Sequence, residues 1–211
     1  MINSKPVSSR RPGPRRAPGA PAGPDEVRRA VLDAAATLFA VRGVGQVSLR
    51  DVAAASNTHL ALIRRYIGNR ADLELAVFDD LSAQLAESVA EHPLSGQGFD
   101  ADSVMGKWSR VASDLTIRGR TLAGRPGFNP VVAMADTLVE GYGLDPLAAR
   151  VRAAQIVATA VGWRVFEDYL VAAGALDAVP LEALREELVH SARRLGATPW
   201  PSPADPVPRP G

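Results

Sequence analysis

A group of basic side chains in the first third of the chain has the composition of a surface that binds negative charge. The stretch "SNTHLALIRRYIGNR", residues 56–70, holds Arg64, Arg65 and Arg70 within seven positions. Guanidinium groups bind phosphate oxygens and reach guanine edges, and apolar side chains beside them can touch a thymine methyl. Arginines on a short helix are more often simply solvated, so the composition alone leaves both interpretations open.

Two short helices joined by a tight turn are predicted to position these side chains. Ser48 is followed three residues later by Asp51, which is the pattern of a capping box at a helix start. Asn57 then tolerates the left-handed conformation that a tight turn needs. A second short helix is expected over residues 59–66. The pair therefore forms a helix-turn-helix, with the second helix as the one that reads DNA.

Helical spacing divides the residues of this pair into a core side and an outer side. Val52, Ala53, Ile63 and Ile67 fit the core, whereas Leu60, Ala61, Arg64 and Arg65 fit the outer face. Longer helices are expected on either side, one beginning after Asp25 and Glu26 and one over residues 71–91. Residues 25–70 are thus predicted to form a three-helix DNA-binding domain.

The rest of the chain is also predicted to be helical. Helices are expected over residues 101–121, 129–142, 146–173 and 180–195, and no segment has the pattern of a strand. The fold class is therefore all-α, with residues 71–198 as a second helical domain. Residues 1–24 are basic and rich in proline and glycine, and residues 199–211 are rich in proline, so both are expected to be disordered.

Composition excludes several other classes of protein. The chain of 211 residues has no cysteine and a net charge of +1. Disulfides and thiolate metal sites are therefore impossible, and neither a membrane span nor a secretory signal is recognisable, so a cytoplasmic location is expected. The five basic residues of the N-terminal arm could lie in a minor groove, or they could belong to a solvated tail or a cloning extension.

The ordered motifs resemble the DNA-binding domain of the tetracycline-repressor (TetR) family of transcriptional regulators. They are "AAATLFAVRG", then "VSLRDVAAAS", then a helix containing an aromatic residue, then "NRADL", and the resemblance covers residues 27–81. The family resemblance implies a homodimeric regulator that binds double-stranded operator DNA and a small-molecule effector. It also implies that residues 71–198 are a helical ligand-binding and dimerisation domain. The downstream half resembles the family only in being helical.

The resemblance also implies which residues meet DNA. The positions are Ser48, Arg50, His59, Leu60, Ala61, Arg64, Arg65, Tyr66 and Arg70. Ser48 stands where the family caps the helix and often touches phosphate, and Arg70 matches a basic residue that usually contacts phosphate. The chain departs from the family at Asn57, where glycine is usual, and at His59, which is a poorer cap than Ser or Thr.

Dimerisation is expected in the last two helices, because they carry more apolar surface than one monomer layer would bury. The candidate interface residues are Val161, Val165, Tyr169, Leu181, Leu184, Leu188 and Leu195. Candidate ligand-binding residues, chosen as the aromatic and methionine side chains of this half, are Met105, Trp108, Phe128, Met134, Tyr142, Trp163 and Phe166. Both groups could instead be monomer core.

Two other classes of function fit the sequence less well. An enzyme would need a catalytic constellation, and His59, His92 and His190 are scattered without a nucleophile, a phosphate loop or metal-ligand spacing. No metal and no cofactor are therefore expected. A helical interaction module without specific DNA binding is the other alternative. The sequence predicts a ligand-responsive transcriptional regulator, acting as a repressor on a palindromic operator and released by a small apolar or amphipathic ligand.

Overall fold

The computed structural model describes residues 21–91, 103–125 and 127–198, and every regular element in these ranges is a helix. The predicted all-α class is confirmed. The expected basic arm lies outside the described residues except for its last four positions, and the expected C-terminal tail lies outside them entirely.

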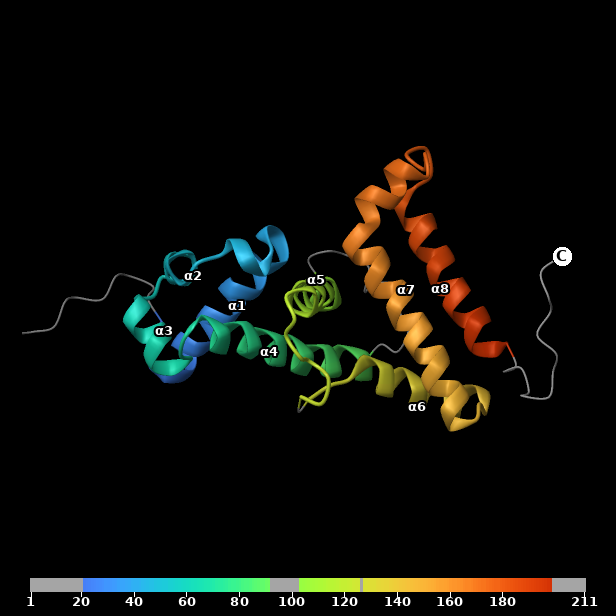
Figure 1. Ribbon diagram of the computed structural model, residues 1–211, viewed down its shortest axis with the longest axis horizontal. Helices are drawn as coiled ribbons and strands as arrows, with labels where there is room; N and C mark the ends of the chain where they lie inside the picture. The colour runs from blue at the N-terminus through green and yellow to red at the C-terminus, as the bar shows by residue number, and fades with distance from the viewer. Residues whose placement is uncertain (1–20, 92–102, 126, 199–211) are drawn as a thin grey trace, which may run out of the picture.

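The described helices follow one another with short connections (Figure 1). They are α1 (Pro24–Arg42), a 3₁₀ turn η1 (Val44–Gln46), α2 (Leu49–Ala55), α3 (Leu60–Tyr66), α4 (Arg70–Glu91), α5 (Val104–Ile117), α6 (Pro130–Tyr142), α7 (Pro146–Ala173) and α8 (Leu181–Ala197). We call α1, η1, α2 and α3 the head.

The helix starts are explained by local chemistry. α1, α6 and α7 each begin with proline in the first turn, where its missing N–H costs nothing. Asn129 and Asp145 cap α6 and α7 by accepting backbone N–H groups. Asp25 and Glu26 lie in the first turn of α1, as predicted, where negative charge favours the helix dipole.

Two predicted C-terminal helix ends differ from the structure, and the connection between α1 and α2 contains the 3₁₀ turn η1, which the sequence did not predict. The helix expected over residues 101–121 ends at Ile117, because Gly119 takes a left-handed conformation (φ 77°) and the chain turns back to donate to the carbonyls of Leu115 and Thr116. The last helix continues two residues beyond the predicted 195 to Ala197.

Two clusters of buried apolar side chains hold the molecule together. The larger draws on α1 to α5 and the turn η1, from Val27 to Leu115, and includes Ile63 of α3 and Trp108 of α5. The smaller joins α6 and α7, with α8 packed against it. Because the larger cluster crosses residue 70, the head shares its core with α4 and α5.

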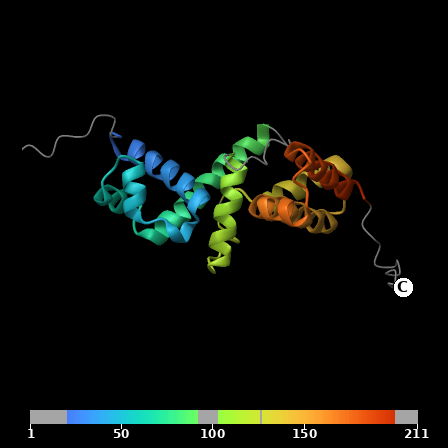
Figure 2. The same ribbon diagram turned by 90° about the horizontal axis from the view of Figure 1, so that it is seen from above.

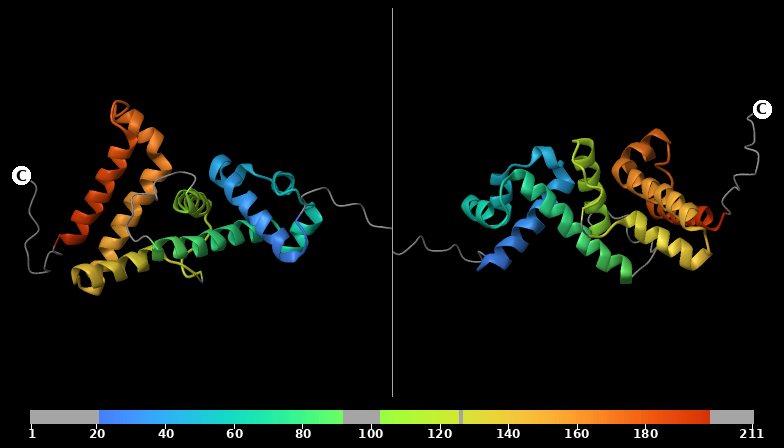
Figure 3. Two further views of the ribbon diagram at one scale, coloured as in Figure 1. Left: turned by 180° about the vertical axis from the view of Figure 1, so that it is seen from behind. Right: turned by 60° about the horizontal axis from the view of Figure 1, so that its bottom comes forward.

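Helix α5 lies between the head and the group formed by α6, α7 and α8. It crosses α4 and packs against α1 on one side and α7 on the other (Figure 2). The same arrangement is visible from behind and from below, where α7 and α8 form an antiparallel pair at the end of the molecule away from α2 and α3 (Figure 3). α5 therefore contacts both halves of the protein.

Candidate nucleic-acid interface

The start of α2 is held by the predicted capping box. The Asp51 amide donates to Ser48 Oγ at 3.2 Å, and the Ser48 amide donates to Asp51 Oδ2 at 2.7 Å. The Ser48 hydroxyl also donates to Asp51 Oδ2 at 2.6 Å. These donors lower the pKa of the Asp51 carboxyl, with the Ser48 hydroxyl as the largest cause. The carboxylate therefore stays charged and keeps the first turn of α2 closed.

The turn between α2 and α3 has the conformation predicted for it. Asn57 lies in the left-handed region with φ 47°, and the Thr58 amide donates to the Ala53 carbonyl at 2.9 Å. The buried Ser56 hydroxyl donates to the Val52 carbonyl at 2.7 Å, so it needs no water. Together these bonds determine the angle at which α3 leaves α2.

Helix α3 has one buried face and one exposed face. Ile63 is fully buried, while His59, Ala61, Arg64 and Arg65 are exposed and Leu60 is half-buried. The exposed Arg50 lies in the first turn of α2.

Two side chains at the ends of α3 have defined local surroundings. Tyr66 is half-buried, and the Arg65 guanidinium lies 5.4 Å from the centre of its ring, which restrains that cation. His59 stands at the N-cap without a side-chain hydrogen bond to the helix, as expected for a poor cap.

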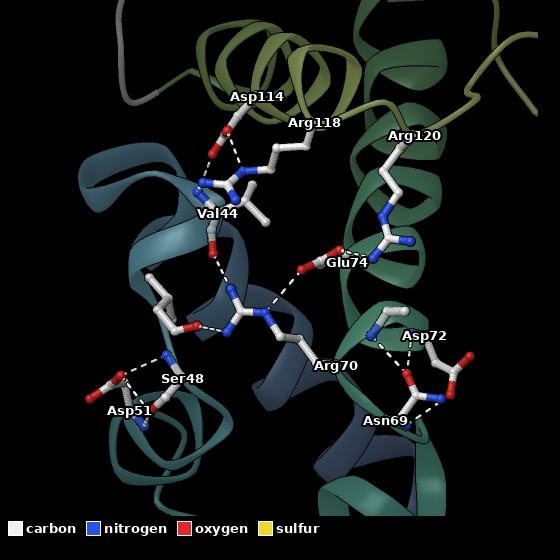
Figure 4. A network of polar contacts seen from close by, with 12 residues as sticks. Val44, Ser48, Asp51, Asn69, Arg70, Asp72, Glu74, Asp114, Arg118 and Arg120 are labelled. Carbon is white, nitrogen blue, oxygen red and sulfur yellow. Dashed lines mark hydrogen bonds and ion pairs between the residues drawn. The ribbon is translucent and has the colours of Figure 1, made fainter.

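Arg70 has a different environment from the other candidate residues. Its guanidinium donates to the carbonyls of Val44 and Val47, and Nε donates to Glu74 Oε1 at 3.0 Å (Figure 4). The group thus ties α4 to the segment between α1 and α2. The expected contact of Arg70 with phosphate stays a prediction. The bonds that the structure shows for Arg70 are internal to the protein and join the head to α4.

A polar network that the sequence did not predict joins the head to α4 and α5 (Figure 4). Glu74 is 5% exposed and accepts from Arg70 and, at 2.8 Å, from Arg120 Nη2, which lies beyond α5. Asp114 of α5 accepts the Val44 amide on Oδ2 and the Arg118 Nε on Oδ1 at 2.7 Å. Arg120 and Glu74 are 46 residues apart in the chain, and Val44 and Asp114 are 70 residues apart. No local sequence motif could therefore have indicated these bonds.

The candidate ligand-binding residues do not form one group. Met105, Trp108 and Phe128 belong to or pack against the larger cluster, and Met134 packs against the smaller one. The indole of Trp108 donates to Ser82 Oγ at 3.0 Å, and that of Trp163 donates to Glu167 Oε2 at 2.7 Å. Tyr142 and Phe166 are exposed.

The candidate interface residues lie on both sides of the α7–α8 pair. Tyr169 and Leu181 are exposed, whereas Val165, Leu184 and Leu188 are half-buried. Val161 packs against the larger cluster and Leu195 against the smaller, so these two contribute to the monomer core. An ion pair of 3.0 Å between Arg185 and Glu167 joins the two helices and raises the pKa of Arg185.

The buried Arg164 lies close to this ion pair. Desolvation, with the nearby Arg185 charge as a second cause, lowers the pKa of Arg164 to about 10. At neutral pH its guanidinium is therefore still charged, and it donates to the Ala160 carbonyl at 2.8 Å.

No group of His, Asp and Glu among the described residues is placed to hold a metal ion. In the same residues, no helix combines the length and apolar character needed to cross a membrane. What the geometry does provide is an exposed, cationic face of α3, whose opposite face packs through Ile63 into the larger core. That arrangement suits phosphate and base contacts in a DNA groove.

Comparison with known proteins agrees with this geometry. The chain is 30% identical over 177 residues to an HTH-type transcriptional repressor of Mycobacterium tuberculosis, which is 83% of this chain and 92% of that protein. An HTH-type transcriptional regulator of Mycobacterium bovis matches to the same extent. No protein-family model matches the sequence.

Two solved structures from Streptomyces coelicolor share the fold. One is a transcriptional regulator with a TM-score of 0.59 at 20% identity, covering 80% of this chain and 97% of that one. The other is described as a tetR-family transcriptional regulator, with a TM-score of 0.54 at 21% identity and 82% coverage of both chains. The mycobacterial relatives show that this chain belongs to the HTH-type transcriptional regulators, and the solved structures show that it has the fold of a tetR-family regulator.

Proposed function

We propose that the protein is a homodimeric repressor that binds a palindromic operator through α3 and is released by a small apolar or amphipathic ligand. The observation that carries this proposal is the outer face of α3, where Arg64 and Arg65 are exposed opposite the buried Ile63. The mycobacterial relative is itself named a repressor, which supports repression as the direction of control.

Each arginine of α3 has a distinct part in the proposed contact. Arg64 is exposed and close to the middle of the helix, where it can reach a phosphate or a guanine edge. Arg65 is restrained by the Tyr66 ring, so it loses less conformational entropy when it binds. His59 and Ala61 at the exposed start of α3 are the proposed base contacts, with Ser48, Arg50 and Leu60 beside them.

A dimer is proposed because one α3 spans only half of an operator, and two half-sites lie one helical turn or a multiple apart. Apolar side chains remain exposed where α7 and α8 meet. They are Phe166, Tyr169, Leu170, Val179 and Leu181. A second copy that covers them would bury part of the roughly 800 Å² per partner that a stable interface needs.

The ligand is proposed to bind in the half formed by α5 to α8. Small-molecule sites are lined mainly by apolar side chains, with a few polar groups that orient the ligand. Trp163 and the Glu167–Arg185 pair offer such a combination between α7 and α8. The ligand acts only if it binds the DNA-competent and incompetent shapes with different affinity, and a coupling of about 1–3 kcal/mol is typical.

The first experiment is selection of random duplex DNA by the purified protein, followed by titration of the winning sequence across a salt series. A palindromic winner and a steep salt slope are expected, since each neutralised phosphate contributes about −0.9 to the slope. The molar mass of the complex gives the number of protomers. Weak binding without sequence preference would instead favour a helical interaction module.

A double variant tests the residues of α3 themselves. Arg64→Ala with Arg65→Ala should abolish operator binding and leave the dimer intact. The matched control is Arg150→Ala with Arg193→Ala, which removes the same charge from exposed positions of α7 and α8. Normal operator binding by the α3 variant would show that α3 is not the reading helix.

A further inference from the structure

The C-terminal end of helix α5 contacts the head at the turn η1, which leads into α2. Asp114 Oδ2 accepts the backbone amide of Val44, a fully buried residue at the start of η1. Its second oxygen is held at 2.7 Å by Arg118, one turn further along α5. The Arg118 guanidinium lies so close to Gly45 that a Cβ there would come within 1.7 Å of it. At the C-terminal end of α5, Asp114 thus bonds to the turn η1 and the Arg118 guanidinium lies directly beside it.

A second connection runs through Glu74 of α4. Its two oxygens accept from different partners, Arg70 on one and Arg120 on the other at 2.8 Å. Arg70 in turn donates to the carbonyls of Val44 and Val47. The chain of bonds therefore leads from the segment after α5 to the residue directly before the Ser48 cap of α2.

These contacts determine where the helix-turn-helix pair sits on the rest of the protein. α2 begins at Leu49 immediately after the anchored segment, and hydrogen bonds close both its capping box and the turn that leads to α3. A displacement of Val44 or Val47 would therefore carry α2 and α3 with it. Hydrogen bonds with a charged partner are stronger than those between neutral groups. The bonds that Arg70 and Arg120 donate to Glu74 are also partly shielded from solvent.

We propose that Asp114 and the Glu74–Arg120 pair are positioning residues for operator binding, through which α5 and the segment after it hold the recognition helix in its DNA-binding position. None of the three lies on α2 or α3. This inference rests on the proposed function, because it concerns affinity for the operator. α5 also packs against α7, so the proposed ligand-binding half is in contact with the head through α5.

For loss of the Asp114 charge, long-range electrostatics and the positioning role predict opposite changes in operator affinity. Loss of a negative charge should leave DNA affinity unchanged or increase it, because DNA is a polyanion. The positioning role predicts that Asp114→Ala weakens operator binding by about tenfold, which is the ratio expected when most of one charge-assisted hydrogen bond is lost. Asp114→Asn keeps an acceptor for the Val44 amide and should stay within about threefold of the wild type, on the same scale.

The connection after α5 offers a matched pair of variants. Arg120→Ala breaks a pair with Glu74, and Arg125→Ala breaks a pair with Asp79, which is formed at 2.6 Å one turn further along α4. Both remove one cation and one ion pair to α4, but only Arg120 is linked through Glu74 to the head. Arg120→Ala should therefore weaken operator binding more than Arg125→Ala does.

The experiment measures operator affinity for these four variants of the full chain, together with amide hydrogen exchange at Val44. The inference predicts faster Val44 exchange in Asp114→Ala, rescue in Asp114→Asn, and the order of affinities given above. Unchanged Val44 exchange, or equal affinities for Arg120→Ala and Arg125→Ala, would overturn it. If Asp114→Ala does not fold, the comparison of operator affinity between Arg120→Ala and Arg125→Ala tests the inference instead.

Failure of the proposed function is a separate result in this experiment. It would appear as a wild-type protein without any preferred duplex, whereas failure of the inference leaves the wild type bound and the variants equal to it. If the wild type prefers no duplex, the exchange measurement still tests the contact between Asp114 and the Val44 amide. Slower Val44 exchange in the wild type than in Asp114→Ala would establish this contact, and equal exchange rates would overturn it.

Discussion

Replacement of Arg70 by lysine separates a structural role from a phosphate contact. The change keeps the positive charge but removes the planar fork, which places separate N–H groups on Val44, Val47 and Glu74. An ammonium group has one nitrogen and cannot span the two carbonyls and the carboxylate together. If Arg70 served only to meet phosphate, lysine would substitute for it with little loss.

The magnitude follows from the bonds that are lost. A hydrogen bond to a charged group contributes about 1.5–3 kcal/mol. The side chain of Arg70 is 38% exposed, so solvent screens its bonds, and we take about 1–1.5 kcal/mol for each of two lost bonds. Arg70→Lys should then lower the free energy of unfolding by about 2–3 kcal/mol. For a chain of this length that corresponds to a fall in Tm of about 4–12 °C.

The assay is thermal unfolding followed by circular dichroism, with operator binding measured well below the transition. Arg65→Lys is the matched control, since Arg65 is exposed on α3 and its replacement should leave Tm unchanged. A Tm of Arg70→Lys equal to that of the wild type, with loss of operator affinity in Arg70→Ala alone, would refute the structural role and restore the phosphate contact.

Three further changes test the head and the proposed dimer. Asn57→Val should destabilise the protein by about 1–2 kcal/mol in chemical denaturation, because a β-branched residue is strained at φ 47°, while Asn57→Gly should stay within about 1 kcal/mol of the wild type. The Ser48 donors lower the pKa of Asp51 below its ordinary value of 3.8, so the stabilisation by this carboxylate is present above pH 3.8 and is lost as pH falls through the lowered pKa. The difference in unfolding free energy between the wild type and Asp51→Asn should accordingly shrink at acid pH, and a constant difference would contradict this. Phe166→Glu with Tyr169→Glu should convert the dimer to a monomer in sedimentation and weaken operator binding, because both side chains are exposed in one protomer; an unchanged mass would move the interface elsewhere.

The features that the sequence by itself determined are those whose partners lie within a few residues. The Ser48–Asp51 box closes over three positions, and the left-handed Asn57 is set by its own side chain and its neighbours. The helical periods of α3 and α4 likewise follow from spacing, which is why Ile63 was predicted in the core and Arg64 outside it. These local rules were enough to indicate a helix-turn-helix, and the order of the motifs indicated the family by resemblance.

Tertiary structure alone decided what Arg70, Glu74 and Asp114 do. In the sequence Arg70 is one more arginine beside a DNA-reading helix, and Asp114 is one acidic residue on a helix of unknown direction. Both residues bond to Val44, which lies 26 residues from Arg70 and 70 residues from Asp114 in the chain. They exist because α4 and α5 cross the head at particular angles, which are set by packing of many side chains in the shared core. Residue spacing encodes which face of a helix is apolar, but not the partner that the opposite face will meet.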